Sequence, residues 1–540
     1  MQQKNDPAYG ANDAGRKQDG QVKGTKKIIP FNGDNVKRDA DDNRKKILVS
    51  ENRPVHEQAA LALAGIAEAG LDVYLEDGNP VRVRKPDGAG VRIEQLDANS
   101  LRHEMSKACN FFKFKYDDDE GKYKEKPMRS APLDIVKDAL GSPENLLPAI
   151  EGILSHPTIS ESGRVVSGYG YNPETKLYID APEEILKAAE NIPVTPTEGE
   201  IEEAVKTINE VITDFPFKSE SDKAGYFAML LTLLFLPMIN SSIPMFLVLA
   251  AAPGTGKSLT ADTAIRIKTG KTATPTALPD NDEELKKTLH SLFLSGAEYV
   301  LFDNVNGKIK SSVLPAVATS RRLNSRILGV NKMADAACNA VMIFTANNPD
   351  LSRENARRLV PIGLASDFEN PSERTGFKHP DLNQYVTDNR PGLIRAALVM
   401  VRAWFADECD CSGVKTLPSF ENWSKTIGGI LKSCGVKGFL ENVGDFFSTA
   451  DMDAENIGGF VRAWYTEKGS FPVTAKDILP IAKDFGLISD SLHSEGSQVK
   501  SLGRILKRKQ DIVFSGVKIT RGTQKCGIQT WKASKVQEVS

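Results

Sequence analysis

The feature that most constrains the fold is a strand, a loop and a helix near the middle of the chain. Met245–Ala250 is an apolar run that is too short for a helix, so it predicts a buried parallel strand. Residues 251–258 read AAPGTGKS, which matches the phosphate-binding pattern G-x-x-x-x-G-K-[ST] except that Ala251 replaces the first glycine. Ser258–Lys268 predicts a helix whose N-terminus points at the same anion. This order favours a nucleotide-binding loop over a glycine-rich turn that matches by chance.

Each residue type in this loop has a chemical reason. Gly254 and Gly256 allow the backbone to turn so that successive N–H groups face a phosphate. Lys257 is placed to reach the β- and γ-phosphates, and Ser258 offers a hydroxyl to Mg²⁺. We therefore expect ATP and Mg²⁺ as cofactors. The expected nucleotide contacts are Pro253, Gly254, Thr255, Gly256, Lys257, Ser258 and Leu259.

A second hydrophobic run ends in an acid and supplies the rest of the expected metal site. Residues 299–303 read YVLFD, and Asp303 is expected to hold Mg²⁺ through water, together with Ser258. Asn304 follows, where many P-loop ATPases have a glutamate, so the base that activates water is left open. The two candidates for this base are Glu298 and Glu354.

Polar residues also follow the next apolar run, Val341–Phe344. Asn347, at the tip of that predicted strand, is placed to orient a water on the γ-phosphate. Arg358, preceded by Arg357, is expected to reach the γ-phosphate of a neighbouring subunit and stabilise charge in the transition state. A salt-bridged surface pair is the alternative for these two arginines.

A basic segment between the acid and Asn347 predicts one contact with DNA. Residues 321–332 read RRLNSRILGVNK, which predicts a strand, a glycine-containing turn and a returning strand. Arg326 and Lys332 on this hairpin are the expected contacts with the phosphate backbone. An ordinary exposed lysine is the alternative for Lys332.

The end of the chain is distinctly basic. Residues 457–540 carry 14 Lys and Arg against 7 Asp and Glu, in a chain whose net charge is −2. Two predicted helices precede short β runs, which is the order of a winged helix; the segments are Thr474–Phe485, Gln498–Lys509, Ile512–Phe514, Val517–Ile519 and Gly527–Trp531. The expected DNA contacts on the second helix are Arg504, Lys507, Arg508 and Lys509. A solvated helix face is the alternative.

Neither cysteine usage nor hydropathy predicts a metal centre or a membrane segment. The six cysteines are scattered, and the close pair Cys409 and Cys411 has no second pair to complete a zinc site. Ala224–Pro237 is apolar but is about a dozen residues long, which predicts a core helix because a span needs ~20 residues. The polar N-terminus predicts no signal peptide. We therefore expect a cytoplasmic protein without a membrane partner.

Several short motifs together resemble a known family. The chain looks like the primase-helicase ATPases of phages, plasmids and integrative elements, which are related to superfamily 3 and AAA+ hexameric helicases. The motor motifs are PGTGKS (253–258), YVLFDN (299–304), SRILGVNK (325–332), TANN (345–348) and NARRL (355–359). The motifs around the motor are GYGYNPETKLYI (168–179), ERTGFKHPDL (373–382), SFENW (419–423) and GVKGFLEN (435–442).

The resemblance implies an α/β fold with an AAA+ (P-loop) ATPase core, an N-terminal α/β accessory domain and a C-terminal winged helix. The expected units are a disordered tail (1–45), the accessory domain (46–195), the ATPase motor (196–391), a helical segment that packs on the motor (392–456) and the winged helix (457–540). The expected elements of the accessory domain are helices at Val55–Ala69, Leu101–Phe112 and Pro132–Leu140, strands around the turn Asp77-Gly78-Asn79, and an exposed charged loop at Lys113–Lys126.

The resemblance also implies the activity. We expect an ATP-dependent DNA helicase that works as a homohexamer in the replication of a mobile genetic element, with ATP sites at subunit interfaces. An AAA+ switch or remodelling ATPase that binds DNA without unwinding it is the alternative. Members of the family often carry a primase, but no acidic metal triad of that kind is evident here. A separate primase or other replication proteins are therefore expected as partners.

Overall fold

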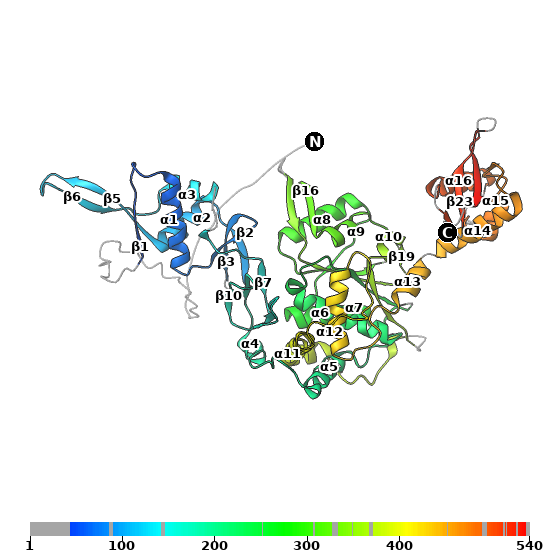
Figure 1. Cartoon of the computed structure of the whole chain (residues 1–540), viewed down its shortest axis with the longest axis horizontal. Coiled ribbons are helices and arrows are strands. Elements are labelled where there is room, and N and C mark those ends of the chain that lie inside the picture. Colours follow the sequence, from blue (N-terminus) through cyan, green and yellow to red (C-terminus); the bar gives the residue numbers. More distant parts are fainter. Residues whose placement is uncertain are drawn as a thin grey trace, which may run out of the picture.

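The structure is a computed structural model, and the central part of the chain is built on a parallel sheet (Figure 1). The described residues are 44–85, 90–141, 146–250, 252–305, 308–326, 333–347, 349–366, 371–450, 452–488, 494–510, 513–514, 516–524 and 528–535. The expected tail at 1–45 lies outside them apart from its last two residues. The strands of the central sheet, in spatial order, are β13 (Pro275–Thr276), β14 (Tyr299–Val305), β18 (Val341–Asn347), β12 (Met245–Ala250) and β20 (Leu359–Leu364).

Every neighbouring pair in this sheet is parallel. Strand β12 is flanked on both sides, and its residues are buried except for the half-buried Leu249. Because consecutive side chains point to opposite faces, this burial means that both faces of the strand are covered. The predicted α/β class and the predicted buried parallel strand at Met245–Ala250 are therefore confirmed.

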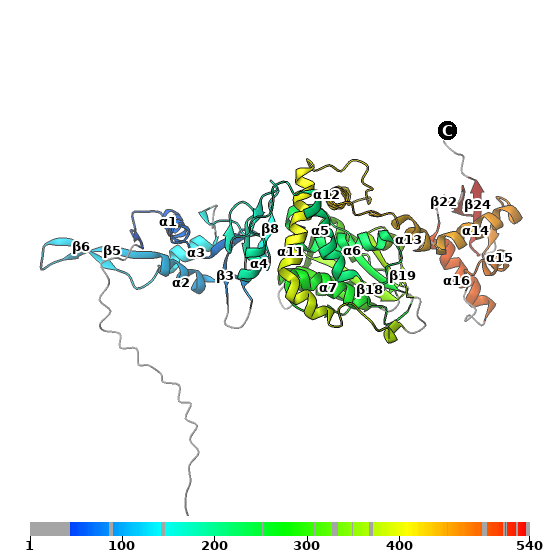
Figure 2. The same cartoon turned by 90° about the horizontal axis from the view of Figure 1, so that it is seen from below.

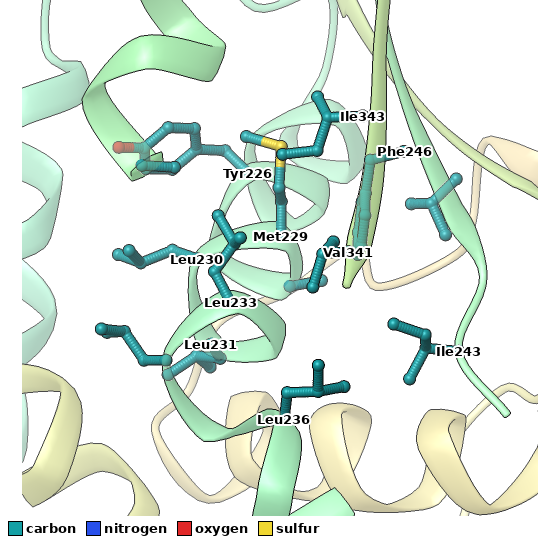
Figure 3. Close-up of a cluster of buried hydrophobic side chains, with 14 of the residues drawn as sticks. Tyr226, Met229, Leu230, Leu231, Leu233, Leu236, Ile243, Phe246, Val341 and Ile343 are labelled. Atoms are coloured by element: carbon teal, nitrogen blue, oxygen red, sulfur yellow. The ribbon is translucent and has the colours of Figure 1, made fainter. Parts of the chain in front are cut away.

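Helix α6 (Glu220–Ile239) is a long apolar helix of this core. Figure 3 shows Met229 and Leu233 of α6 close to Phe246 of β12 and Val341 of β18, and all four side chains are buried. By length and composition alone α6 could cross a membrane, but 83% of its apolar window is buried inside the protein. It packs as a core helix, in agreement with the core helix expected from the sequence.

Helix α11 (Leu382–Ala406) packs against α5 (Glu198–Ile212) and α7 (Lys257–Thr269). Pro391 lies inside α11, so the expected boundary at residue 391 falls within one continuous helix. A proline removes one helical hydrogen bond, but burial of apolar side chains before and after it, such as Val386 and Leu393, maintains the helix.

Arg390 joins three segments that are distant in sequence. Its buried guanidinium donates hydrogen bonds to the carbonyl oxygens of Ile267 at 2.8 Å, Lys268 at 2.5 Å and Ser155 at 2.9 Å. The first two carbonyls lie at the end of α7, where a helix leaves carbonyl groups without partners. Burial lowers the pKa of Arg390 to about 10, so its side chain remains charged at neutral pH. The end of α7 is therefore attached both to α11 and to the segment around Ser155.

Two of the motifs that follow the motor have structural roles. Trp423, at the start of α12 (Glu421–Ser433), is fully buried, and its Nε1 donates to Thr232 Oγ1 of α6 at 2.9 Å. Asn442 Nδ2 donates to Asp222 Oδ1 at 2.8 Å, and the same oxygen accepts from the backbone N–H of Gly363 at 2.7 Å. SFENW and GVKGFLEN thus attach the helical segment to α6 and β20.

The N-terminal elements form a second core. Helices α1 (Val55–Glu68), α2 (Ala98–Ala108) and α3 (Leu133–Gly141) surround a cluster that includes Ile47, Leu63, Met105 and Ile135, and strand β1 (Lys45–Leu48) pairs with β5 (Cys109–Asp117) in parallel. The predicted helices at Val55–Ala69 and Pro132–Leu140 are confirmed. The small sheets beside them contain β2 (Val73–Glu76), β3 (Asn79–Arg84), β4 (Arg92–Gln95), β7 (Gly152–Leu154), β8 (Thr158–Ile159), β9 (Val165–Val166), β10 (Gly170–Asn172) and β11 (Leu177–Ile179).

Two predictions for this region are wrong. The helix predicted over Leu101–Phe112 ends at Ala108, and the segment Lys113–Lys126, predicted as a loop, belongs largely to β5 and to β6 (Lys122–Pro127). The reason is a change of period at Cys109. From there aromatic and lysine side chains alternate, as in Phe112-Lys113-Phe114-Lys115-Tyr116, and alternation with period two favours a strand.

The C-terminal elements surround a third core that contains Phe460, Trp464, Leu502 and Trp531. They are α14 (Met452–Lys468), β21 (Val473–Thr474), α15 (Leu479–Asp484), α16 (Glu495–Arg508), β22 (Val513–Phe514), β23 (Val517–Arg521) and β24 (Thr530–Lys535). The sheet has the order β21-β24-β23-β22, and its described pairs are antiparallel. The helix predicted from Thr474 begins five residues later, because Thr474 pairs with Thr530 in the sheet.

The remaining elements lie around the central sheet. They are α4 (Glu183–Ala188), α8 (Asp282–Leu294), β15 (Lys308–Ile309), α9 (Val313–Ser320), β16 (Arg322–Arg326), β17 (Met333–Ala337), β19 (Asp350–Leu351), α10 (Arg353–Ala356) and α13 (Val443–Ala450). β16 and β17 pair antiparallel, which confirms the predicted hairpin, but the returning strand begins at Met333, after the predicted segment 321–332.

Candidate nucleotide-binding site

The loop after β12 has the backbone geometry that its glycines predict. Gly254 has φ +74° and Gly256 has φ +97°, which is the left-handed region. A Cβ at Gly254 would lie 3.1 Å from the backbone nitrogen of Ser372, and a Cβ at Gly256 would lie 3.2 Å from Cε1 of Phe215. Both positions therefore require glycine, first for the backbone conformation and second for the close approach of neighbouring segments.

Helix α7 begins at Lys257, directly after this turn. Lys257 is only 7% exposed, and in the part of the chain that the structure describes its ammonium group makes no hydrogen bond or ion pair. Burial lowers its pKa, and the nearby carboxylate of Asp303 opposes that shift. A buried cation without a partner is costly, so the position favours an anionic ligand. The first backbone N–H groups of α7 have no partners within the helix, so they too can donate hydrogen bonds to an anion at its N-terminus.

Asp303 on β14 is held by two hydroxyl groups. Ser258 Oγ donates to Asp303 Oδ1 at 2.7 Å, and Thr345 Oγ1 of β18 donates to the same oxygen at 2.5 Å. Thr345 Oγ1 in turn accepts from the backbone N–H of Asn304 at 2.7 Å. Asn304 has φ +50°, and the pairing of β14 with β18 shifts register between Phe302 and Val305, so the strand turns at the acid.

Asn347 ends β18 beside the residue that ends β12. The register pairs Ala250 with Asn347, so the amide lies at the carboxyl end of the strand that leads into the loop. Its Oδ1 is buried and has no hydrogen-bond partner among the residues that the structure describes. Buried polar atoms are usually paired, so this orphaned oxygen is placed to receive a hydrogen bond from a ligand or a water.

The residues brought together fit Mg²⁺ and a nucleotide phosphate chain. Ser258 and Asp303 supply the oxygen ligands that Mg²⁺ prefers, while Lys257 and the loop N–H groups can neutralise phosphate charge. Four observations support this fit: the glycine cradle, the unpaired Lys257, the linked Ser258–Asp303 pair and the orphaned Asn347 oxygen. The sequence-predicted residues at these positions therefore lie within one site.

A cavity of about 310 Å³ opens beside the loop. It is bounded by Gly254, Thr255, Gly256 and Leu259 on the loop side. Its other side comes from the segment before α6 and from ERTGFKHPDL, and the largely apolar lining includes Phe215, Pro216, Phe377, Pro380 and Leu382. A volume in the ~300–1,000 Å³ range with a mainly apolar lining is typical of small-molecule sites.

Segment 373–382 is attached to α5 and to the residues that follow it. Arg374 Nη1 donates to the carbonyl oxygen of Asp214 at 2.6 Å, and the backbone N–H of Lys378 donates to Asp214 Oδ2 at 2.7 Å. Lys378 Nζ and His379 Nε2 lie 2.7 and 2.9 Å from Glu210 Oε1. The hydrogen bond from Lys378, and then that from His379, lowers the pKa of Glu210. These contacts hold the cavity wall against the loop.

The two candidates for the catalytic base lie in different places. Glu298 precedes β14 and forms an ion pair with Lys268 at 3.0 Å, whereas Asp303 lies near the opposite end of that strand. Five residues of strand span about 16 Å, so Glu298 is far from the loop of its own chain. Glu354 lies on α10, is exposed, and is 3.9 Å from Arg358. The base remains unassigned.

The two candidate arginines are also far from the loop of their own chain. Arg358 directly precedes β20, and its carbonyl oxygen accepts from the N–H of Met245, the first residue of β12. The loop follows the other end of β12, again about 16 Å away. Arg358 Nε donates to Thr319 Oγ1 at 3.3 Å, and its Nη1 donates to the carbonyl oxygen of Glu354 at 3.0 Å. Arg357 is exposed and, among the described residues, its side chain has no hydrogen bond or ion pair.

The expected DNA contacts lie outside this site. Arg326 ends β16, and Lys332 lies outside the described residues. On α16, Arg504 and Lys507 are exposed and Lys509 caps the helix; Arg508 is its last residue. Lys500 is also exposed, one turn before Arg504, while Leu502 and Leu506 face the core. The i, i+4, i+7 spacing of Lys500, Arg504 and Lys507 could have identified Lys500 from the sequence.

Comparisons with known proteins add little. No family model matches the chain, and no curated protein matches it. Solved structures do match, among them two apo chains of the A form of the NrS-1 C-terminal region. One has a TM-score of 0.39 at 11% identity and covers 87% of this chain and 98% of that chain. The other has a TM-score of 0.41 at 11% identity and covers 88% and 98%. A likeness at this level carries no argument about the site.

Sequence reasoning missed several residues of the site. Thr345 links Asp303 to Asn304, and Phe215, Arg374 and Phe377 line the cavity. Thr345 belongs to the TANN motif, and Arg374 and Phe377 belong to ERTGFKHPDL, so the motifs contained them. Phe215 gave no signal in the sequence, because only the fold brings it to Gly256.

Proposed function

We propose that the chain is an ATP-dependent DNA helicase with an AAA+ core, which acts as a homo-oligomeric ring during replication of a mobile genetic element in the cytoplasm. The observation that carries the proposal is a group of four polar residues at the carboxyl ends of the strands of a parallel sheet. They are Lys257, Ser258, Asp303 and Asn347. The strand that carries Asn347 lies between the loop strand and the acid strand, an order that supports an AAA+ core.

The residues of this chain suggest how nucleotide would be held. The loop N–H groups and Lys257 bind the phosphates, and Ser258 with Asp303 holds Mg²⁺, which neutralises phosphate charge when bound. The cavity beside the loop receives the base, with Phe215 and Phe377 as apolar contacts. Asn347 orients the attacking water through its free Oδ1.

The position of the arginines supports a ring. Arg357 and Arg358 lie at the amino ends of the sheet strands, whereas the loop lies at their carboxyl ends, so the two arginines cannot serve the nucleotide of their own chain. In a ring of identical subunits, the arginines of one copy meet the nucleotide of the next. Arg357 has the free side chain that such a contact requires, and Arg358 becomes available only if it leaves Thr319 and Glu354.

The C-terminal elements support binding to DNA. The order α14-β21-α15-α16-β22-β23-β24 supports a winged helix, in which the helix before the hairpin meets the nucleic acid. Lys500, Arg504 and Lys507 share the exposed face of that helix. Lys507 and Arg521 also line a hollow between α16 and the hairpin, which concentrates positive charge there.

Strand displacement on a forked duplex tests the proposal. We expect the wild-type chain to separate the strands with ATP and Mg²⁺, and the Lys257→Ala variant to fail. ATP hydrolysis that DNA stimulates, without strand displacement on forks of either polarity, would contradict helicase activity and favour the DNA-bound switch. Absence of ATP binding by the wild-type chain would contradict both.

A further inference from the structure

The N-terminal part carries a two-stranded arm that the proposed function does not use. β1 pairs with β5 only over Cys109–Phe112, so from Lys113 onward β5 pairs with β6 alone. Figures 1 and 2 show this ribbon extending away from helices α1–α3 in both views. Beyond Phe112 the side chains of both strands are exposed, except for the half-buried Asp117 and Lys124.

One face of the ribbon gathers lysines opposite one another. The register pairs Lys113 with Lys126 and Lys115 with Lys124. Like charges directly opposite each other destabilise a strand pair, and an ordinary solvated ribbon places opposite charges there. Lys124 is compensated by Asp117 at 2.8 Å, but Lys113, Lys115 and Lys126 form no ion pair among the described residues.

The other face of the ribbon carries exposed aromatic rings. Phe114 is 51%, Tyr116 is 47% and Tyr123 is 69% exposed. Tyr116 and Tyr123 lie opposite each other, with ring centroids 5.1 Å apart and planes at 69°. None of the three rings belongs to the hydrophobic core of this part of the chain, so packing in that core does not account for them. Three neighbouring exposed rings form a surface on which flat apolar groups can stack.

We propose that the β5–β6 ribbon binds single-stranded nucleic acid, with bases stacked on Phe114, Tyr116 and Tyr123 and phosphates contacted by Lys113, Lys115 and Lys126. Exposed rings combined with unpaired cations are the two elements that bind single strands without sequence preference. The ribbon is two strands wide, and neighbouring strands are only about 5 Å apart, so lysine side chains reach around its edges to a strand that lies on the aromatic face.

The charge distribution limits the site to the middle of the ribbon. Glu125 pairs in register with Phe114 on the aromatic face, and Lys46 Nζ lies 3.0 Å from its carboxylate and balances its charge. The other acidic residues of the ribbon lie in or beside the turn, where Asp117 and Glu120 hold Lys122 and Lys124. Asp118 and Asp119 in the same turn repel phosphate. The site thus ends before the tip. A duplex is less suitable than a single strand, because its bases are already stacked and cannot lie on the rings.

Two variants of the full chain test the two halves of this proposal by anisotropy with a labelled oligo(dT). Substitution K113Q/K115Q/K126Q is expected to lower affinity and to reduce the slope of log K against log salt by ~2, because each phosphate contact contributes about −0.7 on single strands. Substitution F114A/Y116A/Y123A is expected to weaken binding at least about tenfold with an unchanged slope, because stacking does not release counterions.

Matched controls separate these effects from general charge or folding. The variant K415Q/K425Q/K437Q removes the same charge from exposed lysines of the central part, and is expected to keep the wild-type slope. The variant F114Y/Y116F/Y123F keeps the rings and is expected to keep the affinity. Ultraviolet cross-linking of the oligo(dT) should map to residues 109–127 in the wild type.

Three results would overturn the proposal. The first is wild-type affinity for oligo(dT) in both ribbon variants. The second is a loss in the ribbon variants of binding to vesicles of anionic lipid with oligo(dT) binding retained, which would assign the ribbon to a membrane surface. The third is equal loss of slope in the K415Q/K425Q/K437Q control, which would show that the lysines of the ribbon have no special position. None of these measurements depends on ATP, so failure here leaves the proposed helicase activity untouched.

Discussion

Ser258 and Asp303, 45 residues apart in sequence, are joined by a hydrogen bond of 2.7 Å from the serine hydroxyl to Oδ1 of the carboxylate. Ser258 is the second residue of α7 and Asp303 lies near the end of β14, so the bond fixes the start of the helix against the acid. A hydroxyl and a carboxylate at this distance can ligate one hydrated cation together.

The first prediction concerns Lys257. Lys257→Ala is expected to abolish ATP hydrolysis and to leave the thermal unfolding temperature at or above that of the wild type. The ammonium group is buried without a partner, so its removal costs no hydrogen bond or ion pair. Phosphate release and a melting curve measure the two effects. Wild-type turnover by the variant would show that the phosphate site lies elsewhere.

The second prediction concerns the acid. Asp303→Asn is expected to lower the hydrolysis rate by at least about a hundredfold, because the neutral amide lacks the negative charge that attracts Mg²⁺. Nucleotide binding without Mg²⁺ should persist. Thr345→Val serves as the graded comparison, since it removes one hydrogen bond to Asp303 and leaves the carboxylate. Equal rates for the wild type and Asp303→Asn over a titration of Mg²⁺ would contradict the assigned metal site.

The third prediction separates the arginines. Mixing Lys257→Ala subunits with Arg357→Ala subunits should restore part of the hydrolysis, because a mixed interface pairs one intact loop with one intact arginine. The same mixture made with Arg358→Ala should restore less if Thr319 and Glu354 hold Arg358 in place. Rates are measured across mixing ratios at constant total protein. Mixtures no more active than their components would argue against action between subunits for both residues.

The fourth prediction concerns the C-terminal part. Removal of residues 451–540 should reduce the salt slope of duplex binding by ~2–4 and leave basal ATP hydrolysis, because only part of the positive charge faces DNA. The cut falls before α14, so this helix is removed together with the core to which its Phe460 and Trp464 belong. Lys500→Gln, Arg504→Gln and Lys507→Gln combined should reproduce most of the effect. An unchanged slope in both proteins would favour a protein-interaction role for this part.

The fifth prediction concerns stability. Trp423→Ala is expected to cost about 3–5 kcal/mol, because the indole is fully buried between α12 and α6. Trp423→Phe should cost less, since it retains a ring and mainly leaves Thr232 Oγ1 without its donor, a loss of about 1–3 kcal/mol. Denaturant unfolding measures both. A loss below 1 kcal/mol in Trp423→Ala would show that this motif does not anchor α12.

Local patterns predicted the strand, the glycine turn and the helix well because all three lie within a single short stretch. Met245–Ala250, the glycine turn and the start of α7 each depend on neighbouring residues. The cavity wall could not be predicted in the same way, since Phe215 and Phe377 are separated by most of the motor. The alternation of Phe and Lys from Phe112 predicts the ribbon, whereas its high charge alone is typical of an exposed loop.

Arg390 gives the fold a mechanical property. One rigid, planar group holds the end of α7, whose first residue is Lys257, and also the carbonyl oxygen of Ser155, which precedes the motor. A displacement of α7 by even an ångström must therefore stretch a buried charged hydrogen bond or carry the segment at 155 with it. In the proposed ATPase, a displacement of the loop before α7 would therefore be transmitted through Arg390 to the N-terminal part.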